Sequence, residues 1–438
     1  MKKICVLGLG YIGLPTASIF ATRGYQVVGV DVNAQVVETL NNGDVHLQEP
    51  GLKIVVQAAL RSGNLSVRAQ PEPADVFIIA VPTPLISDGE SPMVDDVRQV
   101  MMQADLSYIR AATESIVPCL AAGNLVILES TSPPGTTEKV VTPILECSGL
   151  KAGQDIFVAH CPERVLPGRI LEELVRNDRV IGGVNRASAE MAKTLYASTV
   201  EGQLFLADAT TVEMVKLMEN AYRDVNIALA NEFALVAEQL GTDVWEAIEL
   251  ANRHPRVNIL KPGPGVGGHC IAVDPWFIVQ AAPEVTPLIQ AARRVNDEMP
   301  AYVVEMVNSA VEGIDKPVIA CLGLAYKADV DDTRDSPAIK VVELLRVKGF
   351  EVRAYDPYVK MGVVPGQVGS IDSAVESADC VVFLTDHDEF RQLSLDNMSS
   401  LHGSGGSWSI VDTRNVLAAQ GGERTANRRL LGRGKVAD

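Results

Sequence analysis

The start of the chain carries the feature that most restricts its fold. An apolar run at residues 4–9 is followed by a helix-forming stretch at 14–23, and a second apolar run at 26–30 ends at Asp31. Between the first run and the helix stands a glycine triplet, Gly8-Leu9-Gly10-Tyr11-Ile12-Gly13. A strand, this triplet, a helix, a second strand and a terminal acid, in that order, are typical of a βαβ unit that binds a dinucleotide.

The residue types of this unit also predict which dinucleotide binds. Gly8 and Gly10 allow a tight turn and let a pyrophosphate approach the helix N-terminus. Asp31 would accept hydrogen bonds from the adenosine ribose and would repel a 2′-phosphate, so the sequence predicts NAD rather than NADP. The alternative is that the glycines only pack the helix against the strand.

Further strands are expected at 75–81, 125–128, 156–159 and 180–183. Thr83 follows the first of these and Thr131 the second. Ligands bind at the carboxyl ends of strands in an open parallel sheet, so both threonines are expected to contact the cofactor unless they only cap helices. After the third strand, Glu163 and Arg164 stand in a turn bounded by proline and glycine, where they could serve substrate or water, or form a surface ion pair.

From about residue 210 the pattern changes from strands to one long helix. Residues 211–239 carry apolar side chains at three- and four-residue steps and contain no proline. Such a helix suggests a connector between domains and a subunit interface. On one face of it lie Glu213, Lys216, Asn220 and Arg223. A stripe of this kind is usually solvated, but Lys216 and Asn220 would form a polar dyad able to handle a hydroxyl group and its proton.

Four glycines precede one cysteine in the segment Gly263-Pro264-Gly265-Val266-Gly267-Gly268-His269-Cys270-Ile271-Ala272-Val273-Asp274-Pro275. If a helix begins near His269, Cys270 and Asp274 lie on the same face, and the helix N-terminus favours a thiolate. This arrangement would present a nucleophile; the alternative is a buried structural cysteine. The preceding run at 252–258 places two arginines and a histidine nearby, as an anionic substrate would need.

Residues 316–438 repeat the opening plan, with strands expected at 318–322, 351–355, 379–385 and 409–411. Asp356 ends the second strand, as Asp31 does. The first loop, Gly323-Leu324-Ala325-Tyr326-Lys327, lacks the glycine triplet, so this half is predicted to be a Rossmann-type domain that has lost dinucleotide binding. From about residue 421 a mobile basic tail is expected.

Composition narrows the class of protein. The 438 residues predict two or three domains, and a net charge of -17 argues against nucleic acid or an acidic membrane as partner. Seven scattered cysteines indicate a reducing cytoplasm without disulfides or a metal site. The N-terminal apolar run resembles a signal peptide, but its glycines argue against that, and no later run reaches the roughly 18 residues that a membrane span needs.

The predicted fold is therefore α/β, with two Rossmann-type doubly wound domains joined by a central helical region and its long connecting helix. We expect an NAD-binding domain at 1–207, a central helical domain with the cysteine loop at 208–312, to which the family resemblance described next assigns dimerisation, and a second Rossmann-like domain at 313–438.

The chain resembles the nucleotide-sugar 6-dehydrogenase family, which includes UDP-glucose and GDP-mannose dehydrogenases. The similarity covers nearly the whole chain and is most specific at 252–275 and 161–168, where it follows the N-acetylmannosamine branch. UDP-glucose members typically have serine where His269 stands, lack the basic run at 253–256, and carry a second glutamate near Pro167. Its absence leaves Glu163 as the candidate for orienting water.

The resemblance implies a four-electron oxidation of a sugar 6-hydroxyl to a carboxylate, with two NAD and one cysteine. Lys216 and Asn220 would serve the first step, as general base or oxyanion stabiliser. Cys270 would form a thiohemiacetal and then a thioester, which water oriented by Glu163, Thr131 or Asp274 would release.

The same resemblance assigns contacts residue by residue. NAD should be contacted by the glycine triplet and by Tyr11, Ile12, Asp31, Thr83, Thr131 and Arg334. The UDP-sugar should be contacted by Arg164, Val165, Lys216, Asn220, Arg223, Gly267, Tyr326 and Lys327. His254 and Arg256 match positions that reach the site of a neighbouring subunit, which implies a homodimer or higher oligomer.

Three alternatives stay open. The sugar could be that of UDP-N-acetylglucosamine or UDP-glucose. A two-electron alcohol dehydrogenase would need neither Cys270 nor a second NAD. A non-catalytic NAD-binding protein would have no need for Cys270, Lys216 and Asn220 together.

Overall fold

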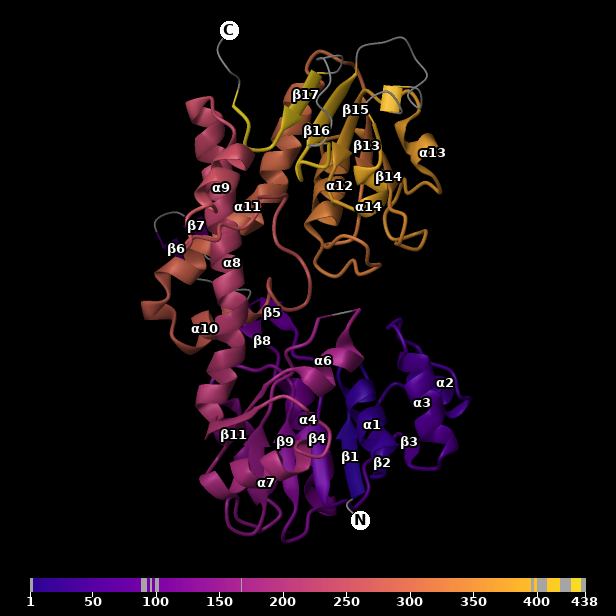
Figure 1. Cartoon of the computed structure of the whole chain (residues 1–438), viewed down its shortest axis with the longest axis vertical. Coiled ribbons are helices and arrows are strands. Elements are labelled where there is room, and N and C mark those ends of the chain that lie inside the picture. The colour runs from indigo at the N-terminus through magenta and orange to yellow at the C-terminus, as the bar shows by residue number, and fades with distance from the viewer. Residues whose placement is uncertain are drawn as a thin grey trace. The chain divides into compact units, whose positions relative to one another are not determined.

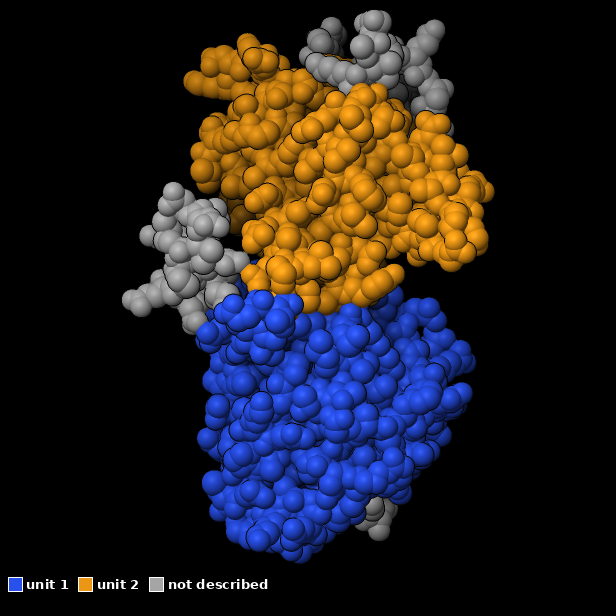
Figure 2. Space-filling view, turned by 90° about the vertical axis from the view of Figure 1, so that its left-hand side faces the viewer, with its two compact units in different colours: residues 1–219, 276–285 blue, residues 220–275, 286–438 orange. Residues whose placement is uncertain are grey.

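The computed structural model describes residues 3–87, 93–94, 97–98, 102–166, 168–394, 398–399, 408–417 and 427–434 (Figure 1). The chain forms two compact units (Figure 2). Unit 1 comprises residues 1–219 and 276–285, and unit 2 comprises 220–275 and 286–438. The division into three domains at 207 and 312 stays a prediction. Among the described helices, none has the length and apolar character that a membrane span requires.

Unit 1 is built on an eight-stranded sheet with the order β12-β11-β10-β9-β4-β1-β2-β3 (Figure 1). All neighbouring strands are parallel except β10 and β11. The run from β3 to β10 has the strand order of a dinucleotide-binding domain, with its switch point between β1 and β4. The strands are β1 Lys3–Leu7, β2 Gln26–Val30, β3 Leu65–Arg68, β4 Val76–Ile79, β9 Leu125–Leu128, β10 Phe157–His160, β11 Arg179–Gly183 and β12 Leu204–Asp208.

Helices cover both faces of this sheet. They are needed because the side chains of β1 point alternately to the two faces and are apolar on both. Ile4 and Val6 belong to a core with α1, α3 and α7, whereas Cys5 and Leu7 belong to a core with α4 and α5. The helices are α1 Gly13–Thr22, α2 Ala34–Asn41, α3 Leu52–Arg61, α4 Ser107–Ile116, α5 Thr142–Glu146, α6 Ile170–Arg176 and α7 Arg186–Tyr196, with short turns η1 Val117–Cys119 and η2 Thr137–Val141. Two small antiparallel pairs join β5 Leu85–Ser87 to β8 Met102–Ala104 and β6 Met93–Val94 to β7 Val97–Arg98.

Unit 2 contains a five-stranded parallel sheet with the order β14-β13-β15-β16-β17. This is a doubly wound order whose switch point lies between β13 and β15. The strands are β13 Val318–Leu322, β14 Glu351–Tyr355, β15 Cys380–Phe383, β16 Ser409–Asp412 and β17 Asn427–Leu430. The helices are α9 Val244–Ala251, α11 Pro287–Ala310, α12 Pro337–Val347, α13 Ile371–Val375 and α14 Asp388–Arg391. The predicted second Rossmann-type domain is confirmed as a fold.

The chain crosses three times from one unit to the other. The long helix α8, Ala209–Leu240, and helix α10, Asp274–Ala281, each contribute residues to both units, and a short turn, η3 Pro283–Val285, precedes α11. The long helix expected at 211–239 is thus confirmed.

The prediction of a mobile tail from about residue 421 is wrong for residues 427–434. β17 is an edge strand that pairs with β16, and Leu431 behind it is buried. The indole of Trp245 donates a hydrogen bond to the Leu431 carbonyl oxygen at 2.8 Å. Basic residues in this stretch, such as Arg428 with Asp412 at 2.8 Å, form ion pairs instead of a solvated tail. Residues 418–426 and 435–438 lie outside the described ranges.

The unit 2 part of α8 has two different faces. Small residues such as Ala228, Ala234 and Ala237 are buried. Larger apolar residues lie on the outside, with 39% to 74% of their surface exposed: Tyr222, Leu229, Phe233, Val236 and Leu240. Tyr222 and Leu229 are seven residues apart and the later members are three or four apart, so all five lie on one face of the helix, which is called the α8 stripe below.

The glycine triplet offers a test of the packing in unit 1. A Cβ at Gly13 would lie 1.8 Å from the Gly8 carbonyl oxygen, whereas nothing lies within 4 Å of a Cβ at Gly10. We expect Gly13→Ala to lower the free energy of unfolding by about 3 kcal/mol, because the neighbour is backbone and cannot move aside. The matched variant Gly10→Ala should change it by less than about 1 kcal/mol. Urea unfolding followed by circular dichroism measures both, and equal midpoints would contradict the expected packing.

Candidate functional site

The carboxyl ends of β1, β2, β4 and β9 bring the predicted cofactor residues of unit 1 together. Asp31 accepts hydrogen bonds from the Leu9 N–H at 2.9 Å and the Asn33 N–H at 2.8 Å. The Thr83 hydroxyl donates to the Thr131 carbonyl oxygen at 2.8 Å and so joins the loops after β4 and β9. These loops lie beside the switch point, where a dinucleotide binds.

The glycine loop itself is open to a ligand. Gly8 has a φ of 89°, which favours glycine, and Gly10 is exposed with free space where a side chain would stand. Tyr11 and Ile12 are half-buried at the start of α1, and Asp31 is also half-buried rather than enclosed. An open backbone beside a helix N-terminus and an accessible carboxylate are what NAD requires, so these residues fit the cofactor.

Glu163 lies in a buried ion pair that the sequence did not reveal. Its Oε2 lies 2.6 Å from Arg179 Nη2, and its Oε1 accepts the Arg164 N–H at 2.8 Å. Both side chains are about 7% exposed. Arg179 stands at the start of β11, where the sequence shows only a charged residue before an apolar run. The ion pair fixes the Glu163 carboxylate in one orientation, and its role in orienting water stays a prediction.

A second carboxylate shares this arginine. Glu129 Oε1 lies 3.6 Å from Arg179 Nη1 and accepts the Tyr196 hydroxyl at 2.6 Å. Burial raises the pKa of Glu129 to about 7, and the nearby Glu163 charge adds to the shift while Arg179 opposes it. Because one arginine faces two buried carboxylates, the more distant Glu129 takes up a proton near neutrality.

The other unit 1 candidates lie around the turn after β10 and on α8. Lys216 is 9% exposed, so the stripe that contains it is not solvated at this position. Arg164 forms an ion pair with Glu219 at 2.6 Å, and Val165 beside it is half-buried. Pro167 lies outside the described residues.

Unit 2 holds the cysteine loop, and the condition for Cys270 and Asp274 to share a helix face, a helix start near His269, is not met. α10 begins at Asp274, and residues 269–273 form turns. Pro275 explains the difference, because proline lacks an N–H and fits only in the first turn of a helix. Cys270 precedes the helix by one turn, and its carbonyl oxygen accepts the Asp274 N–H at 2.8 Å.

The residues around Cys270 nevertheless converge within unit 2. Asn220, 6% exposed, donates to Asp274 Oδ2 at 2.5 Å. The Gly268 N–H donates to the Arg334 carbonyl oxygen at 3.0 Å, while the Arg334 side chain pairs with Asp332 at 2.6 Å. Burial and the charge of Arg334 lower the pKa of His269. The structure thus brings Asn220, Asp274 and the Arg334 backbone to the cysteine loop.

A buried polar chain, missed in the sequence, supports the start of this loop. The Gly263 N–H donates to Asn231 Oδ1 at 2.9 Å, and Asn231 donates to Asn296 Oδ1 at 2.9 Å. Asn296 donates to Asp224 Oδ1 at 2.8 Å, which also lies 2.6 Å from Arg293 Nη1. Each of the four side chains is at most 2% exposed. The only sequence signal was the presence of asparagines inside helices, which is unfavourable without such partners.

Burial disfavours the thiolate at most of the other cysteines. Burial raises the pKa of Cys5 and Cys380 to about 12 and that of Cys161 to about 11. Cys270 is exposed, as is Cys147. No disulfide joins any two of the seven cysteines, all of which lie in the described ranges. Cys270 is the exposed cysteine that stands on the glycine-rich loop.

The remaining candidates of unit 2 are less enclosed. Tyr326 and Lys327 are half-buried after β13, and Gly267 is buried against Tyr326. Arg223, His254 and Arg256 are exposed. The candidates therefore form two groups, one in each unit.

Comparison with known proteins gives a consistent result. Models of the UDP-glucose/GDP-mannose dehydrogenase family match the NAD binding domain at residues 2–200, the central domain at 210–298 and the UDP binding domain at 320–419. The chain is 52% identical to a UDP-N-acetyl-D-mannosamine dehydrogenase of Methanocaldococcus jannaschii, over 95% of this chain and 93% of that protein. It is 48% identical to an NDP-N-acetyl-D-galactosaminuronic acid dehydrogenase of Ralstonia nicotianae, over 96% and 97%.

A solved structure extends the similarity to the fold. The UDP-D-ManNAc dehydrogenase of Pyrococcus horikoshii superposes with a TM-score of 0.89 at 47% identity, covering 99% of this chain and 100% of that one.

Because Arg179 faces both Glu129 and Glu163, the free energy of unfolding is expected to depend on pH in a specific way. The folded protein keeps the Glu129 proton up to a pKa of about 7, whereas the unfolded chain releases it near 4.5. Between these values the folded state holds more protons, so this group lowers the free energy of unfolding as pH rises, by at most about 1.4 kcal/mol per pH unit. Glu129→Gln should remove this contribution.

The measurement is the difference in urea stability between wild type and Glu129→Gln from pH 4.5 to 8. A difference is needed because burial lowers the pKa of His160 to about 3, so that His160 makes the free energy of unfolding rise with pH. This contribution is the same in both proteins and cancels. The variant should gain relative stability up to about pH 7 and then level off. A constant difference would show that Glu129 does not titrate in this range.

Proposed function

Because the chain belongs to the UDP-glucose/GDP-mannose dehydrogenase family of NAD-dependent dehydrogenases, we propose that it oxidises the 6-hydroxyl of UDP-N-acetyl-D-mannosamine to the carboxylate. The uronate product would serve polysaccharide biosynthesis. The observation that carries this proposal is Cys270, exposed on a four-glycine loop beside the buried Asn220–Asp274 pair. The substrate rests on relatives near half identity that bear the name of this reaction.

NAD, when bound to the glycine loop and Asp31, supplies the acceptor for hydride from the sugar C6. Lys216 or a group beside it takes the proton of the 6-hydroxyl, or Lys216 stabilises the oxygen that loses it. Asn220 orients the same hydroxyl. The product of this half-reaction is an aldehyde.

Cys270 acts in the second half-reaction. Its thiolate adds to the aldehyde carbon, and the oxygen takes up a proton to give a thiohemiacetal. Loss of a second hydride and a proton gives a thioester, and water then displaces the thiolate. In total one alcohol, two NAD⁺ and one water give one carboxylate, two NADH and three protons. Glu163, Thr131 and Asp274 are the candidates for orienting the water.

A related substrate is the second candidate. The Ralstonia relative is nearly as similar and is named for an N-acetylgalactosamine-type uronate. UDP-N-acetylglucosamine and UDP-glucose are further candidate substrates to be tested beside it. The chemistry is the same for each of these sugars, and UDP-N-acetyl-D-mannosamine is the first candidate because relatives at 52% and 49% identity bear its name.

The direct test is the amount of NADH formed per UDP-N-acetyl-D-mannosamine consumed. Two NADH per sugar and an acidic product are expected, because oxidation passes the aldehyde. If another of these nucleotide sugars gave two NADH per sugar and UDP-N-acetyl-D-mannosamine gave none, the proposed substrate would be wrong. One NADH per sugar would overturn the role of Cys270.

Cys270→Ser separates binding from catalysis. We expect NAD and UDP-sugar to bind as in wild type, with uronate formation lowered by about three orders of magnitude or more, because serine is a far weaker nucleophile at neutral pH. The matched control is Cys147→Ser, which removes the other exposed thiol and should leave turnover unchanged. Normal uronate production by Cys270→Ser would eliminate the thioester route.

We also propose a homodimer whose interface includes the α8 stripe, in the cytoplasm. Five exposed apolar side chains on one face of α8 favour a protein partner, and His254 and Arg256 would reach the neighbouring site. The absence of disulfides among seven cysteines supports a reducing compartment.

Charged residues on the stripe test the dimer. The double variant Tyr222→Asp, Phe233→Asp should sediment as a monomer and lose most of its turnover, because two carboxylates would be buried without partners. Val347→Asp is the matched control, since Val347 is 85% exposed but lies on α12. A dimeric double variant, or a fully active monomer, would contradict the shared site.

A further inference from the structure

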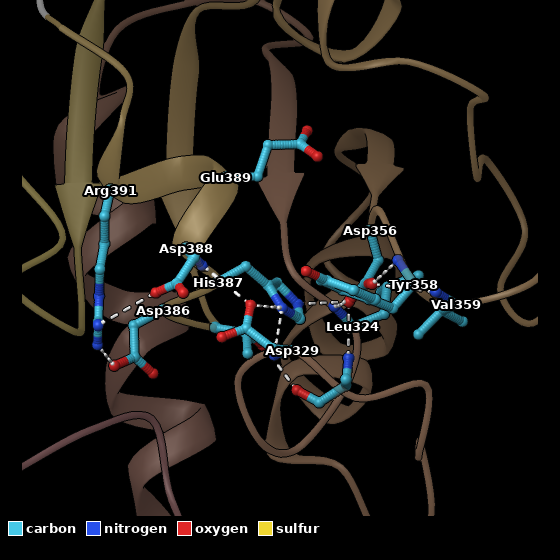
Figure 3. A network of polar contacts seen from close by, with 12 residues as sticks. Leu324, Asp329, Asp356, Tyr358, Val359, Asp386, His387, Asp388, Glu389 and Arg391 are labelled. Atoms are coloured by element: carbon cyan, nitrogen blue, oxygen red, sulfur yellow. Dashed lines mark hydrogen bonds and ion pairs between the residues drawn. The ribbon is translucent and has the colours of Figure 1, made fainter. Parts of the chain in front are cut away.

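Asp356 occupies the same position in unit 2 as Asp31 in unit 1, at the end of the second strand, but its environment is different. Its side chain is fully buried, and each oxygen accepts several hydrogen bonds (Figure 3). The donors, at 2.6 to 3.1 Å, are the N–H groups of Leu324, Ala325, Tyr358 and Val359 and Nε2 of His387. A saturated carboxylate cannot serve a ribose, so this acid has another use.

His387 connects that acid to a second point of the loop after β13. Its Nδ1 accepts the Asp329 N–H at 2.9 Å, so the ring proton is on Nε2 and is donated to Asp356 Oδ2 at 3.0 Å (Figure 3). The ring is fully buried, and the rings of Tyr358 and Phe390 pack on it with centroids 5.1 and 5.3 Å away. The imidazole is therefore held in one orientation and one tautomer.

The loop at 324–329 is fixed at both ends. At its start, Asp356 binds two N–H groups and the Thr385 hydroxyl donates to the Ala325 carbonyl oxygen at 2.6 Å. At its end, Asp329 has a φ of 59°, an unusual conformation for a residue other than glycine, and its Oδ1 accepts the Asp388 N–H at 3.0 Å. Between the two ends stand Tyr326 and Lys327.

The same loop supports the cysteine loop. A Cβ at Gly268 would lie 2.8 Å from the Tyr326 ring, and a Cβ at Gly267 would lie 2.8 Å from Tyr326 Cβ. The backbone just before Cys270 thus packs directly on Tyr326, with no room for a side chain. Any shift of Tyr326 would be transmitted to this backbone, because both contacts are at packing distance.

We propose that His387 is a positioning residue, which joins Asp356 to Asp329 and thereby holds Tyr326 and Lys327 in a preformed nucleotide-sugar site against the cysteine loop. This inference rests on the proposed function, since it takes unit 2 to bind a UDP-sugar. The proposal also explains why an acid, Asp356, stands after β14 although it does not bind a ribose. A loop fixed before binding avoids the ordering cost that a flexible loop would add.

Three variants separate the two hydrogen bonds of His387. His387→Phe removes both and keeps an aromatic ring. His387→Gln keeps an N–H near the Nε2 position for Asp356, and His387→Asn keeps an acceptor near Nδ1 for Asp329. We expect His387→Phe to raise the Kd for UDP and the KM for the UDP-sugar about tenfold or more, with smaller rises for the other two. The KM for NAD should change by less than about twofold, because unit 1 is untouched.

Hydrogen exchange supplies a readout that needs no substrate. In His387→Phe the amides of Leu324, Ala325 and Asp329 should exchange faster, while those of β13 keep their protection. Tyr355→Phe is the matched control, because it removes a hydrogen bond to Glu389 at 3.0 Å in the same unit but outside the loop. This control should match wild type in UDP affinity and in exchange.

The outcomes are distinguishable. If His387→Phe lowers thermal stability but leaves UDP affinity and loop exchange as in wild type, His387 only fills the core and the proposal is overturned. An equal rise in the KM for NAD also overturns it. If wild type turns over none of the UDP-sugars, the proposed function fails, and the exchange rates of the three amides still decide the role of His387.

Discussion

A carboxylate that follows the second strand and holds the loop after the first strand is the interaction on which both units depend. Asp31 accepts the Leu9 N–H at 2.9 Å, and Asp356 accepts the Leu324 N–H at 2.6 Å. Parallel neighbours end at the same edge of a sheet, so this meeting follows from topology. In unit 1 the carboxylate stays half-buried and open to a ribose. In unit 2 burial alone would raise the pKa of Asp356, but hydrogen bonds from His387 and the loop amides lower it to about 2.

Buried charged side chains form the second set of supporting contacts, and in each unit they hold a loop that carries candidate site residues. Arg179 fixes Glu163 in the turn after β10, and Arg293 with Asp224 anchors the amide chain that ends at Gly263. Replacing either arginine alone would leave a carboxylate in the core without its partner, which is strongly destabilising. Their contacts hold the two loops in definite positions.

The sequence predicted the sheets well, because buried parallel strands are apolar runs with little ambiguity. β2, β9, β13 and β14 lie where the runs placed them. The edge strands β3, β12 and β17 were not predicted: β3 alternates and β17 is basic, so both look like loop or tail, whereas the apolar run of β12 was overlooked. The helix after Cys270 begins at Asp274 and not near His269, a later start that Pro275 favours.

The sequence by itself determined the family, the cofactor class and the nucleophile candidate, because motifs such as the glycine triplet and the four-glycine cysteine loop are contiguous and carry their chemistry locally. Only the tertiary structure decided which charges are buried and what they hold. Arg179 and Glu163 are 16 residues apart, and His387 and Asp356 are 31 apart. A partner at such separation leaves no periodic signal in the chain. It exists only once neighbouring strands have brought these residues to one edge of the sheet, the amino end of the antiparallel β11 beside the carboxyl end of β10 and the carboxyl ends of the parallel strands of unit 2, and have removed the side chains from water.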